Sequence, residues 1–243
     1  MISNIDDNVG KLMAKLQALD LDKETLVIFM NDNGGTAGVD LWNANMRGCK
    51  ATSWFGGTRA ISFWRWPGVL QPRTVDKLTG HVDLLPTLAE LTGAKINAEH
   101  QERLDGISLV PLLTSSDTAW SDRMLFTHVG RWPTGKTADH KYSQCAVRWQ
   151  QYQLVRSDTC SDPKCGGECR FLRQTIKGAT KNFYSPSKGQ FHYAVTPHGQ
   201  WALYDVKQDP SQEKNLAKEH PQIVERMAAG YEQWWDDICE NIE

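Results

Sequence analysis

The fold class is decided by the stretch Thr25–Gly68, TLVIFMNDNGGTAGVDLWNANMRGCKATSWFGGTRAISFWRWPG. It opens with an apolar run rich in β-branched residues, Thr25–Met30, which predicts a buried strand. The run stops at Asn31–Gly35, where Asn and Gly tolerate positive φ and predict a turn. Because open α/β sheets present ligands at the carboxyl ends of their strands, we expect a ligand site at this turn.

Two oxygen-bearing side chains, Asp32 and Asn33, are neighbours in this turn. Ca²⁺ and Mg²⁺ prefer oxygen ligands, and no Cys or His stands beside the pair to favour zinc. The pair therefore predicts a site for Ca²⁺, with Mg²⁺ as a second possibility. Since Asp-Asn-Gly is also a common turn sequence, the pair alone leaves an ordinary turn as the alternative.

The residues that follow favour a functional site. Lys50 stands nine residues before Arg59, Gly56-Gly57 lie between them, and an apolar strand, Ala60–Trp66, ends at Pro67-Gly68. This order resembles the formylglycine-dependent sulfatases, the arylsulfatase family of the alkaline phosphatase superfamily. The resemblance continues through four further segments: Asn4–Gly10, Gly80–Leu88, Leu203–Asp205 and Asn215-Leu216.

The resemblance implies hydrolysis of sulfate esters, in which a formylglycine attacks sulfur and Ca²⁺ polarises the sulfate oxygens. By position, Asp32 and Asn33 match metal ligands of the family, and Lys50 matches the lysine that contacts the sulfate. Two positions depart from the usual family pattern: Phe55 replaces a Glu, and Ala60-Ile61 replace Val-Pro. The implied partner is a sulfated small molecule or carbohydrate.

Other side chains are weaker candidates. Arg59 is expected to hold the loop together rather than to touch substrate. The remaining candidates for the substrate pocket are His81, His128, Arg131 and Trp132. For Lys50 the alternative is a solvated surface cation, and for His81 it is a structural or solvated histidine.

Two rival functions stay open. A phosphodiesterase or phosphatase of the same superfamily would use Thr or Ser and two zinc ions, and Asn33 argues against it because such sites take Asp and His ligands. A non-catalytic binding or structural module is the second rival, because the sequence contains no Cys-x-Pro-x-Arg motif or Ser version of it. Cys169 and Arg173 have the right spacing, but Phe171 and Leu172 do not fit that motif.

The first residues already have a helical apolar period, Ile5, Val9, Leu12, Met13, Leu16 and Leu19, which predicts a packed helix. In the sulfatases a helix like this lies in mid-chain. We therefore expect the chain to be the C-terminal half of a sulfatase, inactive alone and prone to self-association.

The expected fold class is α/β: the C-terminal part of an alkaline-phosphatase-like α/β/α sandwich, plus a small antiparallel sheet with a packed C-terminal helix. Residues 1–118 are assigned to the catalytic domain and residues 119–243 to an α+β subdomain. In the first part, Asp83 is expected to cap a helix that Gly93 ends. In the second part, we expect strands at Met124–Val129, Cys145–Trp149, Tyr152–Arg156 and Trp201–Val206, and a helix from Pro221.

Composition restricts the partners and the compartment. A net charge of −2 argues against nucleic acid, and no apolar run approaches the ~20 residues of a spanning helix. The family resemblance implies a periplasmic or secreted parent protein. Three close cysteines, Cys160, Cys165 and Cys169, are then expected to contain a disulfide, with a zinc site as the alternative.

Overall fold

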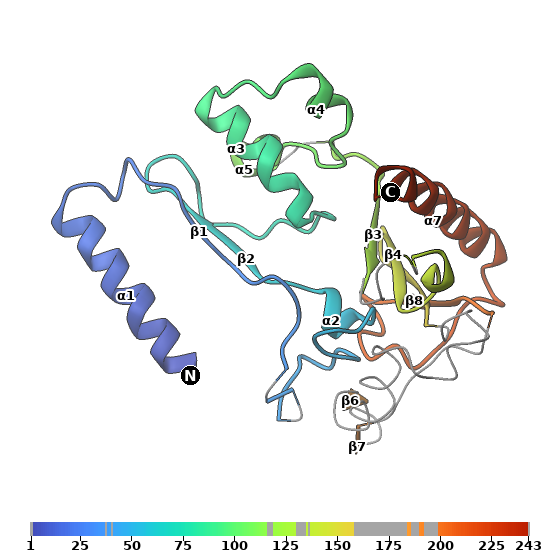
Figure 1. The fold of residues 1–243 in the computed structure, drawn as a ribbon. Helices are drawn as coiled ribbons and strands as arrows, with labels where there is room; N and C mark the ends of the chain where they lie inside the picture. The colour runs from blue at the N-terminus through green and yellow to red at the C-terminus, as the bar shows by residue number, and fades with distance from the viewer. Residues whose placement is uncertain are drawn as a thin grey trace. The chain divides into compact units, whose positions relative to one another are not determined.

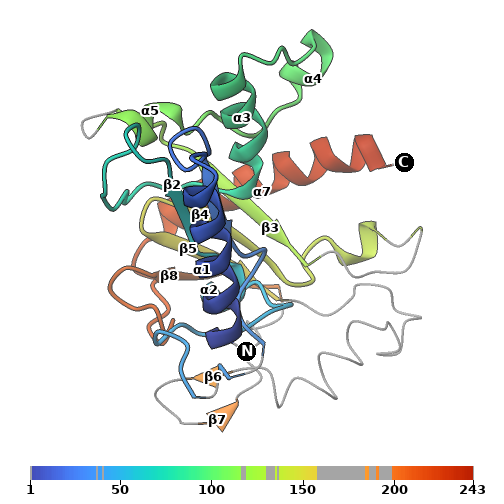
Figure 2. The same ribbon diagram turned by 90° about the vertical axis from the view of Figure 1, so that its left-hand side faces the viewer.

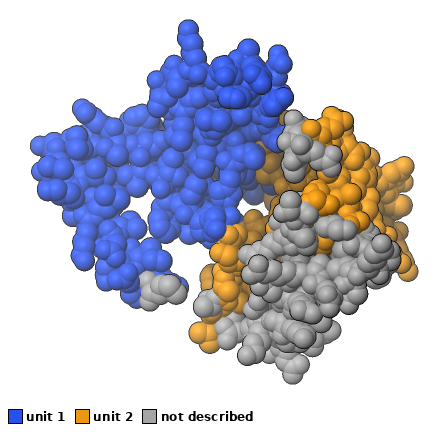
Figure 3. Space-filling model, in the orientation of Figure 1, with its two compact units in different colours: residues 1–32, 60–120 blue, residues 33–59, 121–243 orange. Residues whose placement is uncertain are grey.

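The structure is a computed structural model that describes residues 2–36, 38–39, 41–115, 119–129, 135, 137–157, 184–185, 190–191 and 199–242. The chain divides into two compact units, shown in Figure 3. The first unit comprises residues 1–32 and 60–120, and the second comprises residues 33–59 and 121–243. The predicted catalytic domain, residues 1–118, includes residues 33–59, but in the structure these residues pack with the C-terminal part of the chain. The predicted domain boundary itself stays a prediction.

The first unit begins with helix α1 (Ile2–Ala18) and a two-stranded antiparallel sheet of β1 (Val27–Met30) and β2 (Ser62–Arg65), visible in Figure 1. Val27 pairs with Arg65 and Met30 with Ser62. Both strands lie within the two apolar runs that predicted them, but the expectation that the first strand is buried was wrong, because no residue of β1 is buried.

Helix α1 confirms the predicted helix but not its packing. No residue of α1 is buried, and Leu12, which the period places on the apolar face, is 54% exposed. The prediction of a packed helix was wrong for this chain because the other elements of the first unit do not cover that face.

The rest of the first unit is helical. It contains a 3₁₀ turn η1 (His81–Asp83) and helices α3 (Leu84–Thr92), α4 (Ala98–Glu102) and α5 (Val110–Thr114). Helix α3 ends at Gly93 with φ 69°, as predicted. Asp83 stands at the N-cap position of α3, as predicted, but its side chain makes no capping hydrogen bond to that helix. Its buried carboxylate accepts from the backbone N–H of Gly80 (2.8 Å) and of Ile107 (3.0 Å), and so joins two loops.

The second unit is built on an antiparallel sheet in the order β3-β4-β5-β8. Its strands, β3 (Met124–His128), β4 (Cys145–Trp149), β5 (Tyr152–Arg156) and β8 (Ala202–Asp205), confirm the small sheet of the predicted fold class. The other elements are helix α2 (Phe55–Thr58), a 3₁₀ turn η2 (Ala138–His140), the pair β6 (Tyr184–Ser185) and β7 (Gln190–Phe191), and helix α7 (Pro221–Ile242).

Each face of this sheet has its own apolar cluster, because successive side chains of a strand point to opposite faces. On one face the side chains of Val147, Leu154 and Leu203 pack against Met227 and Tyr231 of α7. Figures 1 and 2 show α7 along the sheet. On the other face, Trp54 from residues 33–59 packs with four residues of the sheet and one that follows it: Ala146, Val155, Ala202, Tyr204 and Val206.

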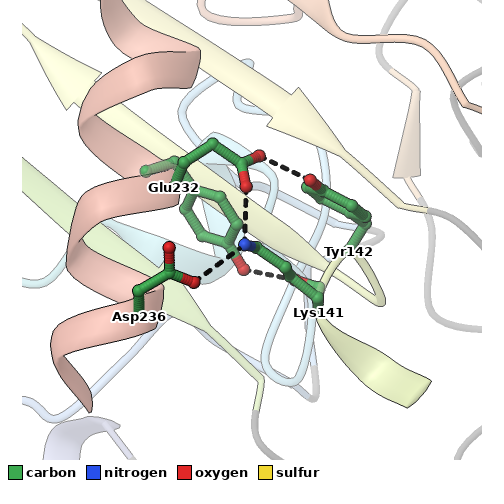
Figure 4. Close-up of polar contacts among 5 residues, drawn as sticks. Lys141, Tyr142, Glu232 and Asp236 are labelled. Atoms are coloured by element: carbon green, nitrogen blue, oxygen red, sulfur yellow. Dashed lines mark hydrogen bonds and ion pairs between the residues drawn. The ribbon is translucent and has the colours of Figure 1, made fainter. Parts of the chain in front are cut away.

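Polar contacts also fasten α7 to the chain before β4 (Figure 4). The Lys141 ammonium lies 2.6 Å from Glu232 Oε2 and 3.1 Å from Asp236 Oδ1. The hydroxyl of Tyr142 donates to Glu232, and the hydroxyl of Tyr231 donates to the Lys141 carbonyl. In the part of the chain that the structure describes, no helix is long and apolar enough to span a membrane.

Candidate active-site loop

The end of strand β1, in the first unit, is held at Asn31. The Asn31 side-chain oxygen accepts from the backbone N–H of Ile61 at 2.6 Å, and the Asn31 carbonyl lies 2.9 Å from His81 Nε2. Because a carbonyl oxygen only accepts, His81 Nε2 carries the proton in this contact. His81 therefore contacts the backbone beside Asp32, which is itself exposed.

The turn continues at Asn33 into the second unit, where backbone hydrogen bonds join it to the lysine loop. Gly34 N–H donates to the Gly57 carbonyl at 3.0 Å, and Lys50 N–H donates to the Gly35 carbonyl at 2.9 Å. The predicted ligand Asn33 and the predicted lysine thus lie on segments bonded directly to each other.

Three glycines make this close approach possible. A Cβ added to Gly34 would lie 1.7 Å from the Gly56 carbonyl oxygen, and one added to Gly56 would lie 2.5 Å from the Gly48 oxygen. A Cβ on Gly57 would lie 2.4 Å from the carbonyl oxygens of Cys49 and Thr52. Glycine is required at these three positions because backbone atoms occupy the space that a side chain would need.

Lys50 itself is exposed. Among the described residues, no hydrogen-bond acceptor or carboxylate binds its ammonium group. Its neighbour Cys49 is buried, and burial raises the pKa of that thiol to about 11, which keeps it neutral. The loop therefore presents the Lys50 ammonium group at its surface.

Phe55, which replaces the usual Glu, lies near two guanidinium groups. The carbon Cζ of Arg59 lies 5.4 Å from the ring centre, and Cζ of Arg148 lies 5.5 Å from it. Burial, together with the positive charge of Arg59, lowers the pKa of Arg148 to about 10. Cation–π contacts with Phe55 thus hold Arg59, whose backbone N–H also donates to the Phe55 carbonyl at 2.9 Å.

The other predicted substrate residues are not brought into this loop. His128 Nε2 lies 2.9 Å from the His140 carbonyl, and its ring lies 4.9 Å from that of Trp235. Burial lowers the pKa of His128 to about 4, so the imidazole is neutral at pH 7. Arg131 and Trp132 lie outside the described residues, as do Cys160, Cys165 and Cys169. Their predicted roles stay predictions.

The donor set at the turn is compatible with a hard cation but small. Asp32 and Asn33 offer side-chain oxygens, which suit Ca²⁺ or Mg²⁺. Within the described ranges, no group of three or more His, Cys, Asp or Glu side chains is gathered in one place. These residues could supply two of the six to eight oxygens that Ca²⁺ takes.

Sequence reasoning missed the residues that anchor the loop to the sheet. Gln212 Oε1 accepts from the backbone N–H of Phe55 at 2.8 Å, and Gln153 Nε2 donates to the Ser53 carbonyl at 2.8 Å. Both glutamines are fully buried. The only sequence signal was that Gln212 lies between two segments of the family resemblance, Leu203–Asp205 and Asn215-Leu216.

Comparison with known proteins agrees with this arrangement. Residues 1–94 match the family model Sulfatase. Mouse (Mus musculus) steryl-sulfatase is 29% identical over 241 residues, which cover 94% of this chain and 35% of the relative. Human (Homo sapiens) arylsulfatase A is 30% identical over 232 residues, which cover 88% of this chain and 38% of the relative. The chain thus spans little more than a third of these relatives.

Solved structures agree in fold. The PsFucS1 sulfatase from Pseudoalteromonas sp. superposes with a TM-score of 0.64 at 18% identity, over 95% of this chain and 40% of that one. A protein solved with its substrate D-glucosamine-2-N,6-O-disulfate gives a TM-score of 0.58 at 17% identity, over 99% of this chain and 40% of that one. Residues 1–94 thus match the sulfatase family model, and the chain as a whole is similar in sequence to known sulfatases and has the fold of solved sulfatases.

Proposed function

We propose that the protein to which this chain belongs is a sulfuric ester hydrolase, and that this chain supplies the lysine that binds the sulfate group. The observation that carries the proposal is the exposed Lys50 ammonium on a loop bonded to the Asn33–Gly35 turn. The match of residues 1–94 to the sulfatase family model and the similarity to known sulfatases support the reaction class. Since the relatives are much longer than this chain, activity is proposed for the whole protein.

The proposed role of Lys50 is electrostatic. A sulfate ester is an anion, and negative charge grows on the leaving oxygen as the sulfur–oxygen bond breaks. A fixed ammonium group lowers the energy of that charge without reorganisation at the moment of reaction. Lys50 fits this role because its backbone is held at Gly35 while its ammonium has no acceptor among the described residues.

Asp32 and Asn33 are proposed as ligands of a divalent cation, Ca²⁺ in the first place and Mg²⁺ otherwise. In related enzymes a formylglycine provides the nucleophile and the cation provides Lewis-acid polarisation of the sulfate. His81 is proposed to hold the backbone next to Asp32 in place, because its Nε2–H donates to the Asn31 carbonyl.

The proposed substrates are sulfate esters of carbohydrates. The support is a structural neighbour whose own substrate is D-glucosamine-2-N,6-O-disulfate. The periplasmic or secreted location implied by the family resemblance belongs to the same proposal.

The test is an assay of the full gene product that contains these residues, with added Ca²⁺, against an aryl sulfate and the matching aryl phosphate. The sulfate ester should be the better substrate. Lys50→Ala should lower kcat/KM by about 100-fold or more, as expected for the loss of one preorganised charge-stabilising group. Lys218→Ala is the matched control, because Lys218 is an exposed lysine elsewhere in the second unit.

Two outcomes would contradict the proposal. One is faster hydrolysis of the phosphate ester than of the sulfate ester, which would favour the phosphatase alternative. The other is normal turnover by Lys50→Ala, which would show that the lysine does not contact the reacting group.

A further inference from the structure

The turn between β8 and α7 contains a strained glutamine. Gln212 is fully buried and has φ 51°, which is uncommon for a residue other than glycine. Asp209 holds the turn: its carbonyl accepts from Gln212 N–H at 3.0 Å, and its carboxylate accepts from the N–H groups of Glu213 (2.8 Å) and Lys214 (2.9 Å). These hydrogen bonds therefore fix the backbone of Gln212 in a conformation that glutamine does not favour.

This turn makes three hydrogen bonds to the loop that carries Lys50. Phe55 N–H donates to Gln212 Oε1 at 2.8 Å, and Arg47 donates twice, from its side chain to the Gln212 carbonyl (2.7 Å) and from its backbone to the Pro210 carbonyl (3.1 Å). Arg47 precedes Lys50 by three residues and Phe55 follows it by five. The turn thus holds the chain on both sides of the lysine.

The two held positions form the base of the lysine loop. Gly56 N–H donates to the Arg47 carbonyl at 2.6 Å, which closes the loop. The Arg47 guanidinium lies 4.2 Å from the centre of the Trp54 ring, and Trp54 contacts Tyr204 of the sheet at 5.7 Å between ring centres. The base is therefore attached to the sheet, while Lys50 lies exposed between its two ends.

Only the acceptor side of the Gln212 amide is used. Within the described residues, Gln212 Nε2 is buried and has no hydrogen-bond partner, whereas Oε1 accepts from Phe55. A glutamate would keep the acceptor that Phe55 needs, whereas an alanine would remove that acceptor from the part-buried N–H of Phe55. Gln212→Met keeps a side chain of similar length without that acceptor; it should behave like Gln212→Ala if the hydrogen bond matters and like Gln212→Glu if only the length of the side chain does.

We propose that Gln212, with Arg47, is a positioning residue for Lys50: the Asp209–Glu213 turn clamps the base of the lysine loop and so sets where the ammonium lies. The inference rests on the proposed function, because the clamp affects catalysis only if Lys50 binds the sulfate. The apolar cluster between the sheet and α7 contains no residue of the lysine loop. Loss of the clamp should therefore loosen the loop without unfolding the second unit.

The test is amide hydrogen exchange of this chain, resolved by residue. In Gln212→Ala, the amides of Lys50, Phe55, Gly56 and Gly57 should exchange about tenfold faster or more, because a local hydrogen bond is lost. Gln212→Glu should keep exchange near the parent rate. Gln208→Ala is the matched control, since Gln208 is exposed beside the same turn. Arg47→Lys is a second variant should Gln212→Ala fold poorly.

Two exchange results would overturn the clamp. One is unchanged exchange at Phe55 and Gly56 in both Gln212→Ala and Arg47→Lys. The other is an equal gain in exchange at Val147 and Leu154, on the core strands β4 and β5, which would mean a general loss of stability.

Turnover by the full gene product then tests whether the clamp affects catalysis through Lys50. Gln212→Ala should lower kcat more than it raises KM, and Gln212→Glu should restore it. Faster exchange with unchanged kcat would overturn the positioning role. If the parent protein hydrolyses no sulfate ester, the proposed function fails, while the exchange result still decides whether the clamp exists.

Discussion

The backbone N–H of Lys50 donates to the carbonyl oxygen of Gly35 over 2.9 Å, although fifteen residues separate them in the chain. The contact joins the turn that follows β1 to the loop that carries the lysine. Gly34 reinforces it by donating to the Gly57 carbonyl. The turn after β1 and the loop that carries Lys50 are separate motifs in the sequence, but hydrogen bonds join them in the structure.

Gly34→Ala tests how far this loop depends on glycine. The new Cβ would lie 1.7 Å from the Gly56 carbonyl oxygen, so the two segments must separate and the bond from Gly34 to Gly57 must lengthen. The free energy of unfolding should fall by about 1–3 kcal/mol, the usual range for overpacking. Urea unfolding would measure it. Gly35→Ala is the control, because its Cβ would meet only the Val39 side chain, at 3.1 Å; an equal loss in both variants would contradict the argument.

Much of the secondary structure was predictable because its signals are local. The apolar runs that predicted β1 and β2 end close to the ends of these strands in the structure. Gly93 ends α3 in the left-handed conformation, as predicted. The strands β4 and β5 were also predicted, and they form a hairpin although its turn is Gln150-Gln151 rather than Asn-Gly. Gln150 adopts φ 50°, and pairing of Trp149 with Tyr152 fixes that turn.

The supports of the site were not predictable, because they come from distant positions. Gln212 lies 157 residues from Phe55, and Gln153 lies 100 residues from Ser53. A polar residue in a turn carries no signal that its side chain enters the interior. For the same reason the contacts of the Asp83 side chain were not predicted: Asp83 does stand at the N-cap position of α3, but its carboxylate accepts from the backbone N–H of Ile107, 24 residues away.

His128 should make stability depend on pH. Burial lowers its pKa from the ordinary 6.5 to about 4, with the His140 carbonyl, the backbone of Lys141 and the Trp235 ring around it. Between those two pH values the unfolded chain binds a proton at this histidine that the folded chain does not. The free energy of unfolding therefore falls as the pH drops from 6.5 towards 4, with a loss on the order of 2 kcal/mol at pH 5.

The measurement is urea unfolding at pH 7 and pH 5 for the parent chain and for His128→Gln. Glutamine can still donate to the His140 carbonyl but does not titrate. The parent should lose more stability than the variant over this interval, while other titrating groups affect both equally. An equal loss in the two proteins would show that His128 is not the group responsible.

Metal binding by these 243 residues should be weak. Asp32 and Asn33 offer two of the six to eight oxygens that Ca²⁺ takes, and the described residues gather no larger group. We expect a Kd above about 100 μM by calorimetry, in the range of weak extracellular sites. Asp32→Ala should remove the remaining binding, whereas Asp22→Ala, a nearby acidic residue outside the turn, should not. One-to-one binding at micromolar Ca²⁺ would show that the shell is more complete than this.

Apolar side chains are exposed throughout the first unit. Leu12 of α1 is 54% exposed, Phe63 of β2 is 64% exposed and Leu85 of α3 is 56% exposed. Phe29 of β1, beside Phe63, is 38% exposed, and the two rings are stacked with centres 6.5 Å apart. Soluble domains rarely leave such large apolar residues uncovered on several elements at once.

This chain should therefore self-associate in water. Burying these side chains against a second copy removes apolar area from water, at roughly 25 cal/mol per Å² before the costs of association. Sedimentation velocity between about 1 and 100 μM, a span chosen to bracket typical weak association, should show a mass that rises with concentration. Leu12→Glu and Phe63→Glu should shift it towards the monomer, because a charge in the contact must be desolvated. Gln17→Glu is the matched control, since it adds the same charge at an exposed polar position of α1. A monomer over the whole concentration range, or an equal shift in the control, would mean that these apolar faces do not drive association.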